Sequence, residues 1–513
     1  MCCECNKMKI NRRTFMGLTA LGFAGAHAVS ATPRSSDMTE EWNPDKPMVS
    51  TGKELCVQPV LVYELYKKKP TTSWRPWGGL HTEQDVSDEV RRITGELDSL
   101  SKNADFPLRV LPVVRVRSIE EAARIRDAGT YDVPIIYAAS GWTNILEGSV
   151  SEKRNNLIFI RHRSGPVYLW YEIIHNRFLR TGGENFELDT FRNPAGMDIN
   201  DIVVDDYGEL VYKLRALYGI RNFIGRRIVA LGGSSGWSCP KAPDVSREKF
   251  NINIITVTYD ELEEKIKAAR ANRNLVSDAE KWTETYLSMP GTTLQTDKQF
   301  VVNAFLLYAI FKDFMAKNNA EAFTIMNCMT TVIPMAETTA CLTLSLLNDE
   351  GLPTFCESDF NVIPSGILLH YISGKPVFLN DPTFPHHGMV TCAHCTAPRR
   401  LDGKRYATAK IVTHFESDYG AAPKVELPIG TEITMVCPDS GQKEWLGFRG
   451  TISENPFYDI CRSQYDIDIE GNWKKLLQDH RGFHWMMACG DYTREMGYAC
   501  PKIGVKWVNV SEA

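Results

Sequence analysis

The residues with the most chemistry in this 513-residue chain gather in its last third. Four of them stand out: Glu357 in a Cys-Glu-Ser-Asp stretch, Asp381 at the end of Val-Phe-Leu-Asn-Asp, His394 in Thr-Cys-Ala-His, and His484 in Gly-Phe-His. Two carboxylates with one or two imidazoles form a mixed oxygen and nitrogen donor set that leaves room for water or a substrate. Such a set favours Mn²⁺ or a similar divalent cation.

The spacing of the two carboxylates suggests how they meet. Glu357 and Asp381 each follow an apolar run that is typical of a strand, and an apolar helix is predicted between them at 363–372. Strands joined by one helix are usually neighbours in a parallel sheet, with their carboxyl ends at the same edge. Open α/β sheets bind ligands at that edge, so we expect the two side chains to converge there.

Individual residues of this region have other possible roles. Asp359 is also placed to cap the amino end of the helix at 363–372. Cys392 and Cys395 flank His394 as a Cys-x-x-Cys pair, which leaves a structural zinc site as an alternative. The chain after residue 31 has no second such pair to complete a four-cysteine site. The combination of donors therefore favours the divalent-cation centre.

Alternating strands and helices must position these residues. Over residues 53–175, and again over 176–350, apolar strand-like runs alternate with amphipathic helical segments. This alternation predicts two Rossmann/flavodoxin-like α/β domains with parallel sheets. A C-terminal domain over 351–513 carries the metal-ligand candidates. After about residue 410 it is β-rich, with short runs punctuated by Gly and Pro that predict a small barrel.

A glycine-rich segment follows the predicted strand at 227–231. Its sequence, Gly-Gly-Ser-Ser-Gly at 232–236, lacks the GxGxxG spacing of dinucleotide-binding loops and the Lys-Ser/Thr of a P-loop. A tight turn at a sheet edge, lining a ligand cleft, is favoured over nucleotide binding.

The first 31 residues are typical of a twin-arginine export signal. Arg12 and Arg13 precede a weakly apolar stretch at 18–26, and small residues allow cleavage after Ala28 or Ala31. The alternative is a basic amino end followed by a short core helix. We expect a periplasmic or otherwise exported protein that uses the twin-arginine export machinery.

Composition excludes several other classes. The net charge is −5, without the basic excess of nucleic-acid-binding proteins. The mature chain has no apolar run long enough for a membrane span. Of 14 cysteines, three fall in the signal, and the remaining odd number is scattered, so buried thiols are expected in place of a disulfide framework.

The candidate residues resemble the L-fucose isomerase and L-arabinose isomerase superfamily. In the fucose enzymes a Thr-Glu-x-Asp motif is followed 24 residues later by a strand-terminal Asp, the spacing of Glu357 and Asp381. A Gly-Ala-His turn of the arabinose enzymes resembles Ala393-His394, and a late Gly-x-His matches the sequence before His484. The resemblance covers about residues 350–500, and the first 300 residues show no residue-level match.

The resemblance implies an aldose–ketose isomerase that acts on a pentose or 6-deoxyhexose through an enediol intermediate. It also implies that Mn²⁺ is bound by Glu357, Asp381 and His484, with His394 as a further ligand. The two carboxylates would in addition transfer the proton. A homo-oligomer is expected. Cys356 replaces the Thr or Ala that the family often has, and the export signal is a second departure.

Two alternatives remain open at the level of sequence. The first alternative to an isomerase is an exported sugar-binding or sensing protein that keeps the metal cleft without turnover. The second is an enzyme with another metal-dependent carbohydrate reaction, such as epimerisation. Measured turnover separates the first alternative from an isomerase, and product analysis separates the second.

Export through the twin-arginine route is directly testable. Replacing Arg12 and Arg13 together with lysine should leave the protein in the cytoplasm with its signal uncleaved, because the export machinery reads the paired arginines. Cell fractionation and the mass of the amino-terminal peptide measure this outcome. Unchanged export of the double variant would refute the assignment.

Overall fold

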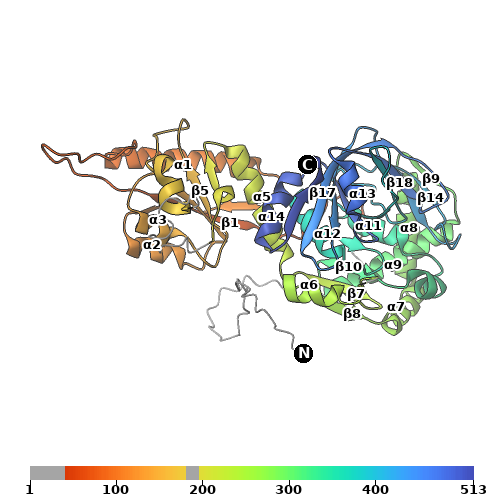
Figure 1. Ribbon diagram of the computed structural model, residues 1–513. Coiled ribbons are helices and arrows are strands. Elements are labelled where there is room, and N and C mark those ends of the chain that lie inside the picture. The colour runs from red at the N-terminus through yellow and green to blue at the C-terminus, as the bar shows by residue number, and fades with distance from the viewer. Residues whose placement is uncertain (1–40, 181–195, 238, 513) are drawn as a thin grey trace, which may run out of the picture. The chain divides into compact units, whose positions relative to one another are not determined.

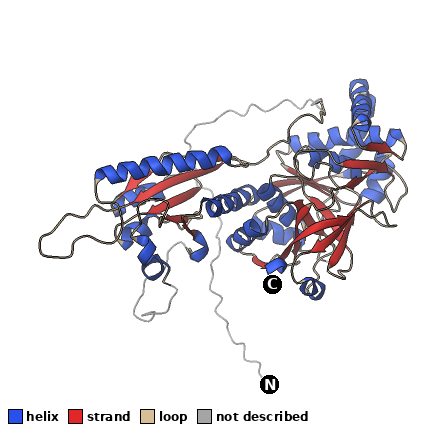
Figure 2. Cartoon of the chain, turned by 90° about the horizontal axis from the view of Figure 1, so that it is seen from above, coloured by secondary structure: helices blue, strands red, loops and turns tan. Residues whose placement is uncertain are grey.

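The computed structural model describes residues 41–180, 196–237 and 239–512. The predicted signal at 1–31 lies outside these residues. The described chain is mixed α/β, with parallel sheets and a closed six-stranded barrel in its C-terminal region, which confirms the predicted combination of α/β parts and a barrel (Figure 1). Figure 2 shows the helices in blue flanking the strands in red.

The first sheet is parallel throughout and has the order β2-β1-β4-β5-β6, with β3 also paired to β1. Its strands are β1 (Leu55–Val62), β2 (Leu108–Val110), β3 (Val114–Val116), β4 (Val133–Ala138), β5 (Leu157–Ile160) and β6 (Ile202–Val204). All eight residues of β1 are buried, as in a parallel sheet with both faces covered. Residues 108–116 form two short strands, because Pro112 between them cannot donate to a ladder.

Helices cover both faces of this sheet. They are α1 (Glu83–Asn103), α2 (Ile119–Arg126), α3 (Thr143–Ser149), α4 (Trp170–Ile174) and α5 (Tyr207–Phe223). Figure 1 shows α1 on one side and α2 and α3 on the other. Thr82 begins α1 with a capping box, and Ser118 caps α2 as its sequence predicts. Because β6 pairs with β5, the first sheet extends beyond the predicted boundary at residue 175.

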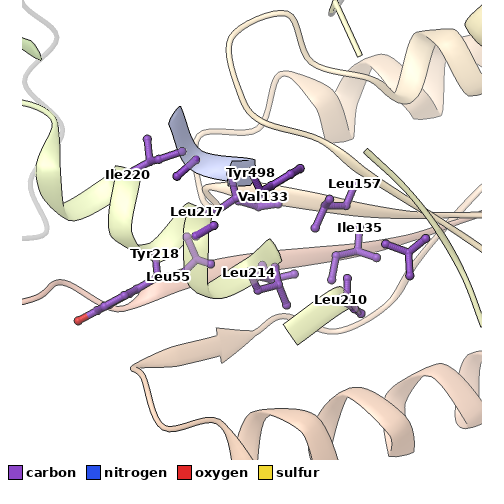
Figure 3. Close-up of a cluster of buried hydrophobic side chains, with 14 of the residues drawn as sticks. Leu55, Val133, Ile135, Leu157, Leu210, Leu214, Leu217, Tyr218, Ile220 and Tyr498 are labelled. Atoms are coloured by element: carbon purple, nitrogen blue, oxygen red, sulfur yellow. The ribbon is translucent and has the colours of Figure 1, made fainter. Parts of the chain in front are cut away.

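Helix α5 is buried on more than one side. Leu210, Leu214 and Leu217 pack against sheet residues such as Leu55 and Ile135 (Figure 3). Another face contacts α12 (Ile363–Ser373), where a Cβ atom on Gly219 would lie 2.5 Å from Ile372 Cγ1. This close approach requires a glycine, and it joins the first sheet to the helix that precedes the barrel.

The second sheet is also parallel, with the order β11-β10-β7-β8. Its strands are β7 (Arg227–Leu231), β8 (Asn253–Val257), β10 (Ala322–Ile325) and β11 (Thr354–Phe355). The helices of this part are α6 (Ala242–Phe250), α7 (Tyr259–Ala271), α8 (Arg273–Ser288), α9 (Lys298–Lys317), α10 (Ile333–Ala336) and α11 (Cys341–Asp349). Since β11 pairs with β10, this sheet continues past the predicted boundary at residue 350.

Helix α9 is the central helix of this part. Fourteen of its 20 residues are buried, which explains why it is apolar on all sides. Among the described residues, α9 alone has the length and apolar composition of a single membrane-crossing helix, and 78% of its most apolar window is buried inside the protein.

The barrel closes through six strands in the order β16-β19-β12-β13-β18-β17, with β17 paired back to β16. These strands are β12 (Phe378–Pro382), β13 (Met389–His394), β16 (Glu432–Pro438), β17 (Glu444–Glu454), β18 (Ser463–Ile469) and β19 (Trp485–Cys489). Every pair within the ring is antiparallel. The barrel begins at Phe378, ahead of the predicted start near residue 410.

Smaller elements complete the fold. β20 (Lys506–Asn509) pairs in parallel with β17, and β9 (Thr292–Leu294), β14 (Thr408–Val412) and β15 (Ala422–Glu426) form a separate sheet. The remaining helices are α13 (Trp473–Gln478) and α14 (Thr493–Lys502).

The expected pairing of the two carboxylate-bearing strands is wrong. β11 belongs to the second parallel sheet, whereas β12 pairs antiparallel with β13 and β19 in the barrel. The rule for strands joined by one helix applies within a single sheet. Here α12 carries the chain from one sheet to another.

Candidate metal centre

Three of the four candidate ligands lie at one end of the barrel. In the antiparallel register Asp381 faces Ala393 and Asn380 faces Trp485, so Asp381 lies next to both His394 and His484. The Oδ1 atom of Asp381 is 3.2 Å from Nε2 of His484. The barrel strands thus bring one carboxylate and two imidazoles close together.

Glu357 reaches the same place from the second parallel sheet. It follows β11 directly, and its Oε2 lies 3.4 Å from Nε2 of His484 while its Oε1 lies 3.6 Å from Nε2 of His394. All four residues proposed from the sequence therefore come together. They do so between the carboxyl end of a parallel strand and the end of a barrel.

The backbone at Glu357 is strained. Glu357 and Ser358 both have left-handed conformations, with φ of +62° and +48°. Residues other than glycine rarely adopt this conformation, and such strain concentrates at functional sites. The glycine-rich loop holds it in place: the N–H of Ser235 donates to the Ser358 carbonyl at 3.1 Å, and the Ser358 hydroxyl donates to the Gly233 carbonyl at 2.9 Å.

The glycine-rich loop is a tight turn, as its sequence indicates. Gly232 and Gly233 have φ of +78° and +111°, and a Cβ on Gly232 would overlap the Tyr259 hydroxyl. The N–H groups of Gly232, Gly233 and Ser235 donate to Val257, Ala230 and Ser358 carbonyls. Because these donors are already used, the loop is poorly suited to hold a phosphate.

Asp359 orients the imidazole of His484. Its Oδ2 accepts a hydrogen bond from Nδ1 of His484 at 2.8 Å, and its Oδ1 accepts from the Asn361 N–H at 3.0 Å. A proton on Nδ1 leaves the Nε2 lone pair free for a cation. The side-chain helix cap considered for Asp359 is not formed, since α12 begins after Val362 without a side-chain cap. His394 Nδ1 contacts the Thr396 hydroxyl at 3.2 Å.

Four inward-facing atoms of the cluster are left without partners. Within the part of the chain that the structure describes, no hydrogen bond satisfies Oε2 of Glu357, Oδ1 of Asp381 or Nε2 of His394 and His484, although all four are buried atoms. Buried polar atoms normally have partners, so each such exception calls for an explanation. A divalent cation among these four atoms provides one, and the donor set fits it.

One side of the cluster is open. The imidazole side chains of His394 and His484 are 5% and 0% exposed, whereas the carboxylates of Glu357 and Asp381 are 33% and 29% exposed. Catalytic metal sites keep a position free for water or substrate, unlike closed structural sites. A small molecule can approach this centre from the carboxylate side.

The charges of the cluster favour a cation at its centre. Burial raises the pKa of Glu357, but the nearby rings of His394 and His484 outweigh it and hold that pKa well below its usual range. Burial raises the pKa of Asp381 despite the same two rings. Burial lowers the pKa of His484, whereas Asp359 and Glu357 outweigh it and raise that pKa to about 10. Positive charge is thus stabilised here.

Two aromatic side chains stand beside His484. Trp237 stacks on Phe483 with ring centroids 4.6 Å apart, and both rings lie edge-on to His484. Each is about half exposed, at 49% and 52%. A stacked, exposed aromatic pair next to a metal-ligand candidate forms an apolar wall for a bound ligand.

Cys356 is a potential ligand that the sequence did not single out. Atoms of Cys356, Glu357 and His394 lie within 4.8 Å of one another, as do atoms of Asp381, His394 and His484. Neither group contains Cys392 or Cys395, so the zinc alternative built on that pair gains no support. All eleven described cysteines are free thiols, and eight are buried, as their scattered spacing predicted.

Asp359 should matter for metal affinity. Replacing Asp359 with asparagine removes the charge that orients His484, and we expect the affinity for a divalent cation to fall about 10–100-fold. Competition with a chromophoric chelator measures this. Asp402→Asn is a suitable control, because Asp402 accepts two backbone N–H groups in a turn outside the cluster. Equal affinities of wild type and Asp359→Asn would show that His484 needs no such partner.

Taken together, the cluster offers a cation two imidazole nitrogens and two carboxylates while its carboxylate side faces solvent. Such a centre can polarise a chelating substrate or activate water. No model of a known protein family matches the sequence, and no curated protein matches it at a significant level.

Proposed function

We propose that the chain is a metal-dependent aldose–ketose isomerase of the L-fucose/L-arabinose isomerase type, acting on a pentose or 6-deoxyhexose through an enediol intermediate. The observation that carries the proposal is the convergence of Glu357, Asp381, His394 and His484 with unpartnered atoms facing one another. The exported location expected from residues 1–31 is part of the same proposal.

The divalent cation would be held by Glu357, Asp381 and His484, with His394 beside them. Mn²⁺ suits these oxygen and nitrogen donors. Once bound, it supplies a Lewis acid that stabilises negative charge developing on the substrate oxygens. Asp359 keeps the His484 ring in the orientation that turns Nε2 toward the centre.

Isomerisation moves a proton between two adjacent carbons. Glu357 and Asp381 are suited to this transfer because both lie within 3.4 Å of the same His484 nitrogen and each is partly exposed on the open side. One carboxylate would remove the proton and the other would return it, as general base and general acid. The buried imidazoles exclude water from the other side of the cluster.

The aromatic wall supports a carbohydrate substrate. Trp237 and Phe483 present ring surface beside the polar cluster, so a ligand held there meets polar groups on one side and an apolar face on the other. Sugars have both kinds of surface, because their hydroxyl groups are polar and their C–H bonds form apolar faces. A 6-deoxyhexose adds a methyl group that ring faces can contact.

The strand order of the first sheet supports a flavodoxin-like fold for this part of the chain. With β2 and β3 counted as one strand, the first sheet has the strand order 2-1-3-4-5 of flavodoxin-like folds. We infer that both α/β parts belong to the Rossmann/flavodoxin-like class and precede the barrel, which is the order of domains in the isomerase superfamily.

A substrate screen tests the function. The purified chain with Mn²⁺ would be incubated with pentoses and 6-deoxyhexoses, and ketose formation would be followed by a coupled assay with product analysis. Appearance of the ketose from one aldose supports the proposal. An epimeric aldose as the sole product overturns it in favour of epimerisation, and saturable sugar binding without product overturns it in favour of a binding protein.

A further inference from the structure

Cys356 is the residue of this cluster that the proposed mechanism does not use. Its sulfur, a carboxylate oxygen of Glu357 and a ring nitrogen of His394 all lie within 4.8 Å of one another. His394 also belongs to the second group, with Asp381 and His484. An ion beside His394 is therefore within reach of a thiol as well as of both carboxylates.

The position of the thiol depends on the strained turn. Adjacent residues of an extended strand point to opposite sides, so Cys356 and Glu357 would not normally face the same site. The left-handed conformation of Glu357 and Ser358 breaks this alternation directly after β11. The strain thus brings a sulfur and a carboxylate from adjacent residues toward one point.

Two further observations indicate a ligand at this point. Nε2 of His394 is a buried atom without a hydrogen-bond partner in the described residues, and the residue is only 4% exposed. Oε2 of Glu357, another member of this group, is likewise a buried atom without a hydrogen-bond partner among the described residues.

We propose that Cys356 supplies a thiolate ligand to the divalent cation, which makes the centre a mixed oxygen, nitrogen and sulfur site. The inference rests on the metal centre of the proposed function. On binding, the S–H bond of Cys356 breaks, a sulfur–metal bond forms and the proton passes to solvent. A thiolate favours borderline ions such as Zn²⁺, Co²⁺ and Fe²⁺ over Mn²⁺.

Cobalt substitution gives a direct readout of the sulfur–metal bond. The metal-free full chain would be titrated with Co²⁺ alone while its absorption is recorded. We expect visible ligand-field bands together with a near-ultraviolet sulfur-to-cobalt charge-transfer band. Cys356→Ser should lose the charge-transfer band, whereas Cys489→Ser, at a buried cysteine of β19 outside the cluster, should keep it.

The outcomes separate this inference from the metal centre itself. Ligand-field bands without a charge-transfer band in the wild type overturn the role of Cys356 and leave the metal centre standing. A charge-transfer band that survives in Cys356→Ser assigns the ligand to another cysteine and also overturns it. Absence of any cobalt binding overturns the metal centre, and this inference with it.

A second variant guards against misfolding of Cys356→Ser. Cys356→Ala, checked by circular dichroism, would be compared with wild type for Zn²⁺ and Mn²⁺ affinity by chelator competition. We expect the ratio of Zn²⁺ to Mn²⁺ affinity to fall by at least about tenfold. Loss of a direct ligand should cost at least as much affinity as loss of a residue that only orients a ligand. An unchanged ratio would contradict a sulfur ligand.

Discussion

Replacing Asp381 with asparagine is expected to lower isomerase turnover by at least about 100-fold while the chain stays folded. The substitution would remove a proposed charged ligand and a proposed acid–base group together, and Asp381 Oδ1 is one of the four unpartnered atoms of the cluster. Because asparagine has the same shape, the barrel strand β12 should be unaffected. Steady-state kinetics with circular dichroism measures both effects.

The barrel offers a matched control for this variant. Asp468 lies on strand β18, is exposed, and has no part in the cluster, so Asp468→Asn should retain wild-type turnover. If Asp381→Asn keeps both its turnover and its metal content, Asp381 neither ligates nor transfers a proton, and the isomerase assignment should be abandoned.

Removing the divalent cation with a chelator is expected to reduce turnover to background, and adding the ion back should restore it. Without the ion nothing stabilises the charge that develops on the substrate oxygens. The melting temperature should fall as well, since a ligand that binds only the folded chain stabilises it. Thermal unfolding and metal analysis would accompany the kinetics. Full turnover in a chain shown to be free of metal would contradict the account.

Strong local patterns made parts of the fold predictable. Strand β7 matches its predicted bounds of 227–231, because a short hydrophobic run that ends at glycines is a local signal. Strands β13 and β19 were not identified. The run Trp485–Cys489 is apolar throughout, and a short run of that kind fits a buried helix segment as well as a strand.

The sequence predicted the ligand residues of the candidate site but not the contacts and backbone conformation that position them. The 24-residue spacing and the Gly-x-His context selected Glu357, Asp381 and His484. The contact between Asp359 and His484 joins residues 125 positions apart, so no local pattern reveals it. The left-handed turn at Glu357 is equally hidden, since glutamate rarely adopts that conformation and the supporting bonds come from the distant glycine-rich loop.

The most direct test of the account is a crystal structure of the chain grown with Mn²⁺, with anomalous scattering used to locate the ion. We expect one peak at about 2.0–2.3 Å from side-chain atoms of Glu357, Asp381 and His484, with His394 in contact or just beyond. No peak at this cluster at saturating Mn²⁺, or a peak bound only by other residues, would contradict the claim that these side chains share one ion.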